Sequence, residues 1–295
     1  MKKILEKYTN KFEEKSVNAT IQQITKGIGA LKTAENLKLA FGLIDLTTLN
    51  ATDTDEKVLK MTEKVSSFKN SYNAIPNVAA ICVYPPFVSL IHKNLKDKNV
   101  KIASVGAGFP SSQTFKSIKI EECRLAKKMG ANDIDIVVSL GKYISGDIEY
   151  VFKEITEIKD AIGDTHLKVI LETGALQTLN DIWTTSIIAM EAGADFIKTS
   201  TGKMEPAATP EAVYIMCLAI KEFYKQTNKK IGIKPAGGIV TPDDALTYIA
   251  IVKEILGAEW LNPELFRLGA SKLANNLLTE INFVETGKAE EVCYF

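Results

Sequence analysis

The sequence feature that most limits the possible folds is a strict alternation between short apolar segments and longer amphipathic ones. Eight times along the chain, an apolar run is followed by a segment whose apolar residues recur at helical spacing, such as Val58, Met61, Val65 and Phe68. The predicted strands are residues 40–48, 78–85, 100–109, 132–140, 166–174, 195–202, 231–239 and 265–271. Short strands that alternate with helices predict a parallel sheet covered by helices.

Eight such units without a break favour a closed (β/α)8 barrel, or TIM barrel, over residues 40–282. Residues 1–39 are expected to form helices packed across the end or flank of the barrel, and residues 283–295 a C-terminal tail. An open, doubly wound sheet is the alternative fold, but no G-x-G-x-x-G follows the first predicted strand. We expect helix starts at Thr209–Pro210 and Thr241–Pro242 and a helix end at Gly130.

Composition excludes several classes of function. Lys plus Arg equals Asp plus Glu at 36 each, so no overall charge attracts nucleic acid or an anionic membrane. No apolar run reaches the roughly 18 residues of a membrane span, and the start lacks a signal-peptide core. The four scattered cysteines predict reduced thiols in the cytoplasm. His92 and His166 are the two histidines, too few to favour a zinc-dependent mechanism.

Strand periodicity assigns several charged side chains to the inside of the barrel. Branched aliphatic residues belong on the outer, helix-covered face, and their neighbours then point inward. This parity places Asp45, Asp135, Lys198 and Lys234 inside. A buried charge needs a partner or a chemical role. A structural salt-bridge cluster is the alternative interpretation, against which two lysines on adjoining strands argue, because like charges repel.

The lysine pair suits imine chemistry. A free lysine has a pKa near 10.4, so only a small fraction is the neutral amine that attacks a carbonyl at pH 7. A neighbouring cation and partial desolvation lower that pKa. We therefore expect Lys198 and Lys234 to act as a pair, with Asp135 as a carboxylate that transfers protons.

Three glycine-bearing loops follow the last three predicted strands, at residues 200–202, 236–238 and 268–271. Barrels of this type often bind a phosphate through backbone N–H groups of these loops, and glycine permits a close backbone approach. Ordinary strand-to-helix turns are the alternative, which becomes weaker for three such loops in succession.

With these residues in hand, the chain resembles the deoxyribose-phosphate aldolase family, the class I aldolases that form a Schiff base. The resemblance covers about Phe41 to Leu278 and is carried by seven segments. They are "IDLTTLN", "AAICVYPPFV", "NDIDIVV", "LKVILETGAL", "GADFIKTSTGK", "GIKPAGGI" and "FRLGAS". Their order and spacing make a coincidence improbable, and "DFIKTSTGK" together with "KPAGG" is the most specific pairing.

The resemblance implies reversible cleavage of 2-deoxy-D-ribose 5-phosphate to D-glyceraldehyde 3-phosphate and acetaldehyde, in deoxyribonucleoside catabolism. It implies no metal or organic cofactor, and a homo-oligomer such as a dimer. By position, Lys198 is the Schiff-base nucleophile, Lys234 the lysine that lowers its pKa, and Asp135 the acid/base acting through a water. The implied substrate-binding residues are Asp45, Thr47, Cys82, Thr201, Gly202, Lys203, Gly237, Gly238, Gly269 and Ser271.

Two departures from the family pattern bear on the site. Val240 stands where the family commonly carries Arg, and we hypothesise that Lys272 restores the missing cation. The N-terminal extension is the other departure. Tyr294 lies next to the end of the chain, where some members carry a tyrosine whose tail folds over the site; here a disordered tail is expected instead.

Three rival functions remain at this point. An aldolase of the same chemistry could use a different or unphosphorylated aldehyde acceptor, in view of Val240. A barrel without activity could serve as a binding module, against which the retained Lys198, Lys234 and Asp135 argue. A metal-dependent aldolase is disfavoured by the scarcity of histidine.

Overall fold

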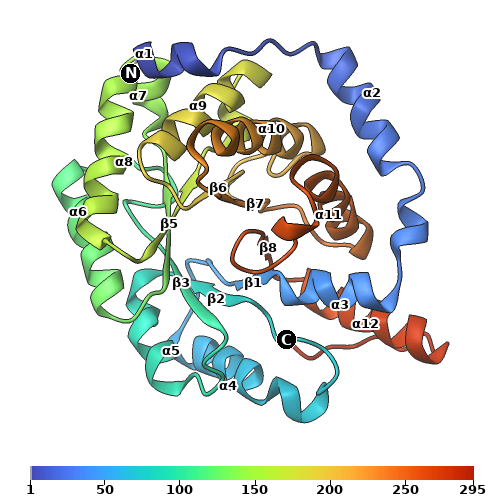
Figure 1. The fold of residues 1–295 in the computed structure, drawn as a ribbon. Coiled ribbons are helices and arrows are strands. Elements are labelled where there is room, and N and C mark those ends of the chain that lie inside the picture. Colours follow the sequence, from blue (N-terminus) through green and yellow to red (C-terminus); the bar gives the residue numbers. More distant parts are fainter. Residues whose placement is uncertain (1) are drawn as a thin grey trace.

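The computed structural model describes residues 2–295, and their eight strands form one parallel sheet curved into a barrel (Figure 1). The strands are β1 (Ile44–Thr47), β2 (Ala80–Val83), β3 (Lys101–Val105), β4 (Asp133–Val137), β5 (His166–Ile170), β6 (Phe196–Lys198), β7 (Gly232–Lys234) and β8 (Leu268–Ala270). They are ordered β7-β6-β5-β4-β3-β2-β1-β8, and the bridges Ile233–Phe266 and Ala236–Gly269 join the two ends. The predicted TIM barrel is confirmed.

Helices surround the barrel (Figure 1). They are α4 (Asp55–Ser71), α5 (Val88–Asn94), α6 (Lys116–Lys128), α7 (Leu140–Ile144), α8 (Ile148–Ile162), α9 (Leu179–Glu191), α10 (Pro210–Thr227), α11 (Pro242–Leu256) and α12 (Leu273–Thr286). The Thr209 side chain caps α10 and Thr241 caps α11, each with proline at the first turn, as predicted. Gly130 follows α6 with φ of 110°, which confirms the predicted helix end.

Residues before β1 lie along the outside of the barrel as α1 (Lys2–Leu5), α2 (Glu14–Thr25) and α3 (Ala34–Gly42). In Figure 1 this blue segment runs from α7 and α9 past α11 to α12. Indole Nε1 of Trp183 donates a hydrogen bond of 2.8 Å to the Tyr8 carbonyl, and Val17 and Ile21 of α2 are buried. The N-terminal segment therefore shares the core of the barrel.

The predicted first strand, residues 40–48, was too long at its start. The Thr33 side chain accepts a hydrogen bond from the Asn36 N–H and begins α3, which continues through Gly42. Ala40 and Phe41 are fully buried as helical residues, so burial made this turn of helix look like part of a strand. An apolar run alone does not distinguish the two.

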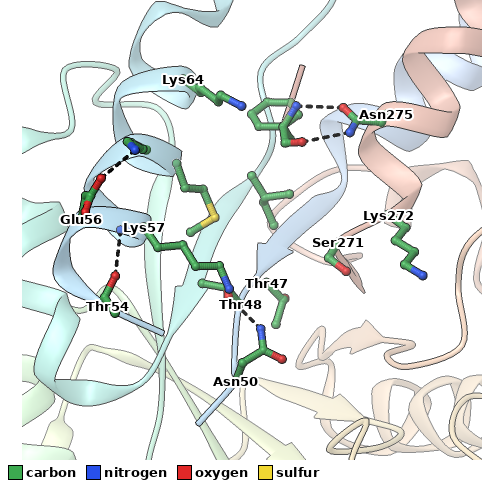
Figure 2. Close-up of a pocket in the computed structure, with 14 residues that line it drawn as sticks. Thr47, Thr48, Asn50, Thr54, Glu56, Lys57, Lys64, Ser271, Lys272 and Asn275 are labelled. Carbon is green, nitrogen blue, oxygen red and sulfur yellow. Dashed lines mark hydrogen bonds and ion pairs between the residues drawn. The ribbon is translucent and has the colours of Figure 1, made fainter. Parts of the chain in front are cut away.

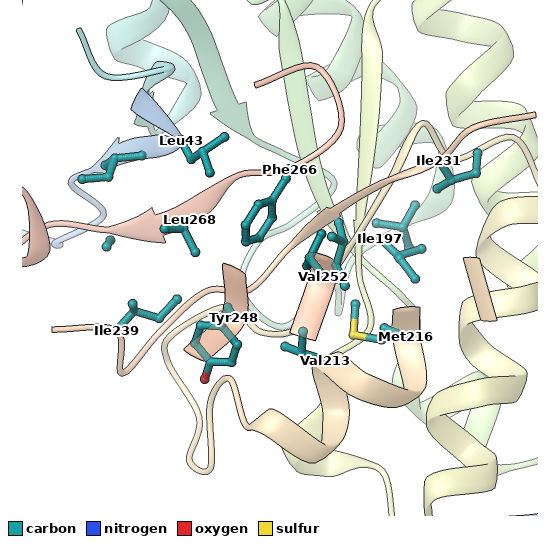
Figure 3. Packing of buried hydrophobic residues seen from close by; sticks show 14 of the residues in the cluster. Leu43, Ile197, Val213, Met216, Ile231, Ile239, Tyr248, Val252, Phe266 and Leu268 are labelled. Atoms are coloured by element: carbon teal, nitrogen blue, oxygen red, sulfur yellow. The ribbon is translucent and has the colours of Figure 1, made fainter. Parts of the chain in front are cut away.

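The main core lies between the barrel and its helices. Figure 3 shows Ile197 of β6 and Phe266 beside Val213 and Met216 of α10, all of them buried. Inside the barrel the filling is different. Near β2 and β3 it consists of small apolar side chains, namely Leu49, Ala80, Cys82, Ala103 and Val105. The remaining strands supply charged groups, which places the chemistry on that side of the interior.

Candidate active site

The centre of the site is the carboxylate of Asp135 on β4, which joins two lysines from distant parts of the chain. Its Oδ2 accepts a hydrogen bond of 2.8 Å from Lys198 Nζ on β6 and another of 2.8 Å from Lys234 Nζ on β7. Lys198 and Lys234 are direct partners in the β6–β7 register. The inward orientation predicted from strand parity is therefore confirmed for all three side chains.

A wider ion-pair network surrounds this centre. Lys234 Nζ lies 2.5 Å from Asp45 Oδ2, and Arg267 Nη1 lies 2.7 Å from Asp45 Oδ1 and 3.4 Å from Asp133 Oδ2. Lys168 Nζ contacts Asp133 Oδ2 and lies 3.6 Å from Asp135 Oδ1. These groups are all buried. The buried salt-bridge cluster weighed as an alternative thus exists, and it includes the two lysines of the predicted chemistry.

The pKa values of the two central lysines shift in opposite directions. Burial lowers the pKa of Lys198 below its ordinary value; Asp135 opposes this shift, and the Lys234 charge adds to it. Burial also acts on Lys234, but the carboxylates of Asp135 and Asp45 outweigh it and raise the pKa of Lys234. Desolvation, more than the neighbouring cation, therefore favours the neutral amine at Lys198.

The carboxylates are held as anions. Burial acts to raise the pKa of Asp135, but Lys198, Lys234 and Lys168 together bring it well below its ordinary range. The pKa of Asp45 is likewise lowered against the effect of burial by Lys234 and Arg267. Asp135 is therefore ionised at neutral pH.

Lys198 opens into a cavity of about 320 Å³ at the carboxyl ends of the strands. Most of the predicted substrate-binding residues line it together: Thr47, Thr201, Gly202, Lys203, Gly237, Gly238, Gly269 and Ser271. Asp45 and Cys82 do not. Both are fully buried beneath the cavity, and burial raises the pKa of the Cys82 thiol. The role of these two residues in the substrate pocket therefore stays a prediction, and Asp45 contacts Lys234.

Glycine is required where the loops of the cavity meet. A Cβ on Gly237 would lie 2.7 Å from the Ala207 Cβ and 3.1 Å from the Gly202 Cα, and Gly237 also has a positive φ of 81°. A Cβ on Gly269 would lie 3.2 Å from the Lys234 Cε. These glycines therefore allow the loops to approach each other and leave backbone exposed to the cavity.

Glu172 holds the turn that follows Lys198. Its Oε1 accepts a hydrogen bond of 3.0 Å from the Thr201 N–H, and its Oε2 accepts one of 2.5 Å from the Thr201 hydroxyl. The Thr201 hydroxyl oxygen in turn accepts from the Lys203 N–H at 3.0 Å. Glu172 is buried and has a positive φ of 52°, uncommon for a residue with a side chain. The chain thus accepts local strain to place this carboxylate behind the turn.

A second, larger cavity of about 640 Å³ adjoins the first and shares Thr47, Asn50, Ser271 and Lys272 with it. Its opposite wall is α4, which contributes Lys57, Lys60 and Lys64. Figure 2 labels Lys57 and Lys64 on this wall. Val240 and Lys272, the two positions of the family departure, both line the smaller cavity. Glu56 also lines the larger cavity and pairs with Lys60 at 2.7 Å, so basic side chains outnumber acidic ones on the approach to the predicted phosphate loops.

The C-terminal tail occupies a different place from either expectation. Tyr294 donates from its hydroxyl to the Lys64 carbonyl at 2.8 Å, outside the catalytic cavity. Asn275 Oδ1 accepts from the N–H groups of Tyr294 and Phe295 at 3.0 and 2.9 Å, and Asn275 Nδ2 donates to the Phe295 carbonyl at 3.0 Å. The two dashed lines at Asn275 in Figure 2 mark the two bonds to Phe295. The Phe295 ring stacks on Phe68 of α4. The tail is therefore docked on α4 and α12, because these contacts satisfy its backbone and bury its rings.

Four buried residues of this site were not singled out from the sequence: Asp133, Lys168, Glu172 and Arg267. Asp133 shares the inward parity of Asp135, and Lys168 stands between outward Leu167 and Val169, so parity alone was a usable signal for both. Arg267 precedes β8, and Glu172 follows β5. Both residues lie outside a strand, where the alternation of side chains no longer predicts which way a side chain points.

The closed parallel barrel, with its buried lysines at the carboxyl ends of the strands, defines a TIM-barrel enzyme of the aldolase class. Residues 39–258 match the family described as DeoC/LacD family aldolase, and the chain belongs to this family. It is thus a lyase.

Individual proteins that resemble this chain agree with the family assignment. The chain is 42% identical over 259 residues to human deoxyribose-phosphate aldolase and 40% identical over 259 residues to the mouse protein. In both cases 84% of this chain and 81% of the relative are covered. Among solved structures, an aldolase called QR15 is 26% identical with a TM-score of 0.67, covering 83% of this chain and 96% of the other. The Aeropyrum pernix deoxyribose phosphate aldolase, described as tetrameric, shares the fold with a TM-score of 0.66 at 23% identity, covering 91% and 98%.

Proposed function

We propose that this enzyme reversibly cleaves 2-deoxy-D-ribose 5-phosphate to D-glyceraldehyde 3-phosphate and acetaldehyde, as a step in deoxyribonucleoside catabolism. The observation that carries the proposal is the placement of Lys198. Its amine shares one cavity with three glycine-bearing loops, and its pKa is lowered. The cavity thus combines a nucleophile with groups suited to a phosphate.

In the proposed mechanism, the Lys198 amine attacks the aldehyde carbon of the open-chain sugar, and loss of one water gives an imine. Removal of the proton from the C3 hydroxyl then breaks the bond between C2 and C3. Glyceraldehyde 3-phosphate leaves, and the electron pair remains as an enamine on Lys198. Protonation of the enamine and addition of one water release acetaldehyde and restore the amine.

Asp135 is the proposed acid/base because its anionic carboxylate lies 2.8 Å from the reacting amine and can act through a water. Lys234 keeps its proton and repels a second charge at Lys198. Thr47 is the candidate partner of a sugar hydroxyl. The backbone N–H groups of Gly202, Gly238 and Ser271, with Lys203 beside them, are the proposed phosphate site.

The test is reduction of the enzyme with borohydride in the presence of acetaldehyde, followed by peptide mass mapping. A two-carbon adduct on Lys198 is expected, and Lys198→Arg should abolish it. Lys221→Arg, an exposed lysine of α10, serves as the matched control and should label normally. An adduct on any other residue would contradict the assignment.

Val240 bears on the alternative that the enzyme uses an unphosphorylated substrate, because this apolar side chain lines the cavity proposed to bind the phosphate. Comparing kcat/KM for deoxyribose with and without its 5-phosphate separates the two functions. The proposal expects a strong preference for the phosphate ester. Equal values would favour an unphosphorylated substrate. Full activity in excess chelator is also expected for imine chemistry.

We further propose that the enzyme is a homo-oligomer that uses α6. Phe115, Ile118, Leu125 and Met129 are 80%, 55%, 45% and 39% exposed and recur on one side of this helix. Exposed apolar stripes of this kind mark interaction surfaces. Light scattering should give at least twice the chain mass, and Ile118→Lys with Leu125→Lys should reduce it to one chain. An unchanged mass in this variant would exclude α6.

No helix in residues 2–295 has the length and hydropathy to cross a membrane. Cys82, Cys123, Cys217 and Cys293 are all free thiols, which supports the proposed cytoplasmic location, where thiols stay reduced.

A further inference from the structure

The interior of the barrel holds an unequal number of ionisable groups of each sign. Among the described residues of the network, four are basic: Lys168, Lys198, Lys234 and Arg267. Three are acidic: Asp45, Asp133 and Asp135. Full ionisation therefore leaves one positive charge in excess. The excess is buried, because each of these residues is at most 3% exposed.

A buried excess charge is costly, and the loss of one proton removes it. Arg267 cannot supply that proton, because guanidinium groups stay protonated in proteins. Lys234 lies within 2.8 Å of two different carboxylates. Lys168 contacts Asp133, lies 3.6 Å from Asp135, and has its ammonium 5.4 Å from the centre of the Phe196 ring. Each of these three cations is stabilised by more than one neighbour.

Among the four basic groups of the network, Lys198 has the fewest neighbours that stabilise its protonated form. Its sole ion-pair partner among the described residues is Asp135, and it shares the same Oδ2 with Lys234. It is also the network lysine that lines the catalytic cavity. The excess charge is therefore relieved at Lys198, where the reaction needs a neutral amine.

We propose that Lys168 is a positioning residue for the reaction, which supplies the excess cation and thereby keeps Lys198 in its neutral amine form. Lys168 does not line the cavity and acts through the two aspartates of β4. The Lys168 ammonium neutralises the Asp133 carboxylate and also interacts with Asp135 through Oδ1. The second interaction weakens the electrostatic attraction between Asp135 and a protonated Lys198. This inference rests on the proposed Schiff-base function.

The other titratable groups around Lys168 do not change the count. His166, on the same strand, lies 3.3 Å from Asp133 Oδ1, and its side chain is 37% exposed, so water screens it. Cys82, on β2, is buried, and its pKa is raised, so the thiol stays neutral. Phe196, the residue of β6 that faces Lys168, carries no charge.

The test follows imine formation with acetaldehyde as a function of pH, by borohydride trapping and mapping to Lys198. Lys168→Gln removes the charge but keeps an N–H donor for Asp133, and Lys168→Met is the second variant in case one fails to fold. Both variants should move the midpoint of the pH profile to higher pH by about one unit. Below the midpoint, such a shift means that the fraction of neutral Lys198 amine is about tenfold smaller.

The double variant Lys168→Gln with Asp133→Asn is the decisive comparison. It removes one charge of each sign and restores the excess, so the midpoint should return towards that of the unmodified enzyme. Lys168→Arg, which keeps the charge, should leave the midpoint in place. A merely structural role would lower the rate without moving the midpoint.

The possible failures are distinguishable. If the unmodified enzyme forms no adduct on Lys198, the proposed function fails. If the adduct forms but the midpoint stays unchanged in Lys168→Gln, this inference alone fails. It also fails if the double variant stays as far from the original midpoint as the single one.

Discussion

At Asp135, a single carboxylate oxygen accepts hydrogen bonds from two lysines at the same distance, 2.8 Å. What separates their roles is the second carboxylate, since Asp45 contacts Lys234 and not Lys198. The number of acidic neighbours thus decides which amine keeps its proton. Substitution of Asp45 on β1 would therefore alter the reactivity of Lys198 on β6.

Glu172 gives a prediction about the turn at Thr201. Glu172→Gln replaces one carboxylate oxygen by an N–H₂ group, so one of the two hydrogen bonds to Thr201 is lost. We expect KM for the 5-phosphate substrate to rise about tenfold, because a hydrogen bond to a charged group contributes about 1.5 kcal/mol or more. The kcat should change much less.

Steady-state kinetics on deoxyribose with and without the 5-phosphate would check this. The unphosphorylated sugar should be nearly insensitive to the substitution, and Glu254→Gln, an exposed change on α11, should behave like the unmodified enzyme. An equal loss with both sugars would show that Glu172 supports Lys198 and not the phosphate turn.

Lys272 gives a second prediction, which concerns the missing Arg. Lys272 and Val240 line the same cavity, so the lysine is placed to replace the cation. Lys272→Ala should raise KM for the phosphorylated substrate about two- to fivefold, since Lys272 is exposed and water screens its charge. The effect should weaken at high salt. An unchanged KM would show that Lys272 does not compensate for Val240.

At the level of elements, short strands supply the charged residues Asp45, Asp135, Lys198 and Lys234 inside the barrel, and the helices outside pack on the strands in the main apolar core. α2 illustrates this packing, because Val17 and Ile21 are buried in the core and Ile24 packs against it, while residues such as Glu14 are exposed. Among the described residues of the N-terminal segment, 2–42, none lines the catalytic cavity. Its role is therefore expected to be structural.

The corresponding prediction concerns Ile21. Ile21→Ala should lower the free energy of unfolding by about 2–4 kcal/mol, the usual cost of removing a buried aliphatic side chain. Urea unfolding would measure it, with Glu14→Ala on the exposed side of α2 as control. The kcat of the folded enzyme should not change. A loss of kcat without a loss of stability would assign α2 a part in the reaction.

For the molecule as a whole, the buried network predicts a loss of stability in acid. The pKa values of Asp45, Asp133 and Asp135 are lowered in the folded state. Such carboxylates stabilise the fold fully above their unfolded pKa of about 4. This contribution begins to be lost as the pH falls below that value, and the loss continues until the pH has fallen through the lowered folded pKa. The free energy of unfolding should therefore fall by more than about 1 kcal/mol between about pH 5 and pH 3.

Urea unfolding at a series of pH values would test this dependence. Asp133→Asn should give a shallower slope below pH 5, because it removes one of the three groups. Asp160→Asn, an exposed change on α8, should keep the original slope. Equal slopes in all three proteins would place the acid sensitivity elsewhere in the molecule.

Local pattern was sufficient for much of this protein. The spacing of apolar residues predicted eight strands and their helices, and strand parity predicted that Asp135, Lys198 and Lys234 point inward. Both follow from chain geometry, since a strand has a two-residue period and a helix one of 3.6 residues. The glycines that line the cavity were predicted because they lie in or shortly after the last three strands.

Closure of the barrel decided the rest. Lys168 meets Asp133, and Arg267 meets Asp45, across separations of 35 and 222 residues that no local period describes. The same closure buried Asp45 and Cys82 below the cavity, and packing between α4 and α12 placed the tail. The sequence by itself thus determined which side chains enter the barrel. The tertiary structure decided which charges meet there, because ion pairing depends on distances that exist only once the ring of strands is complete.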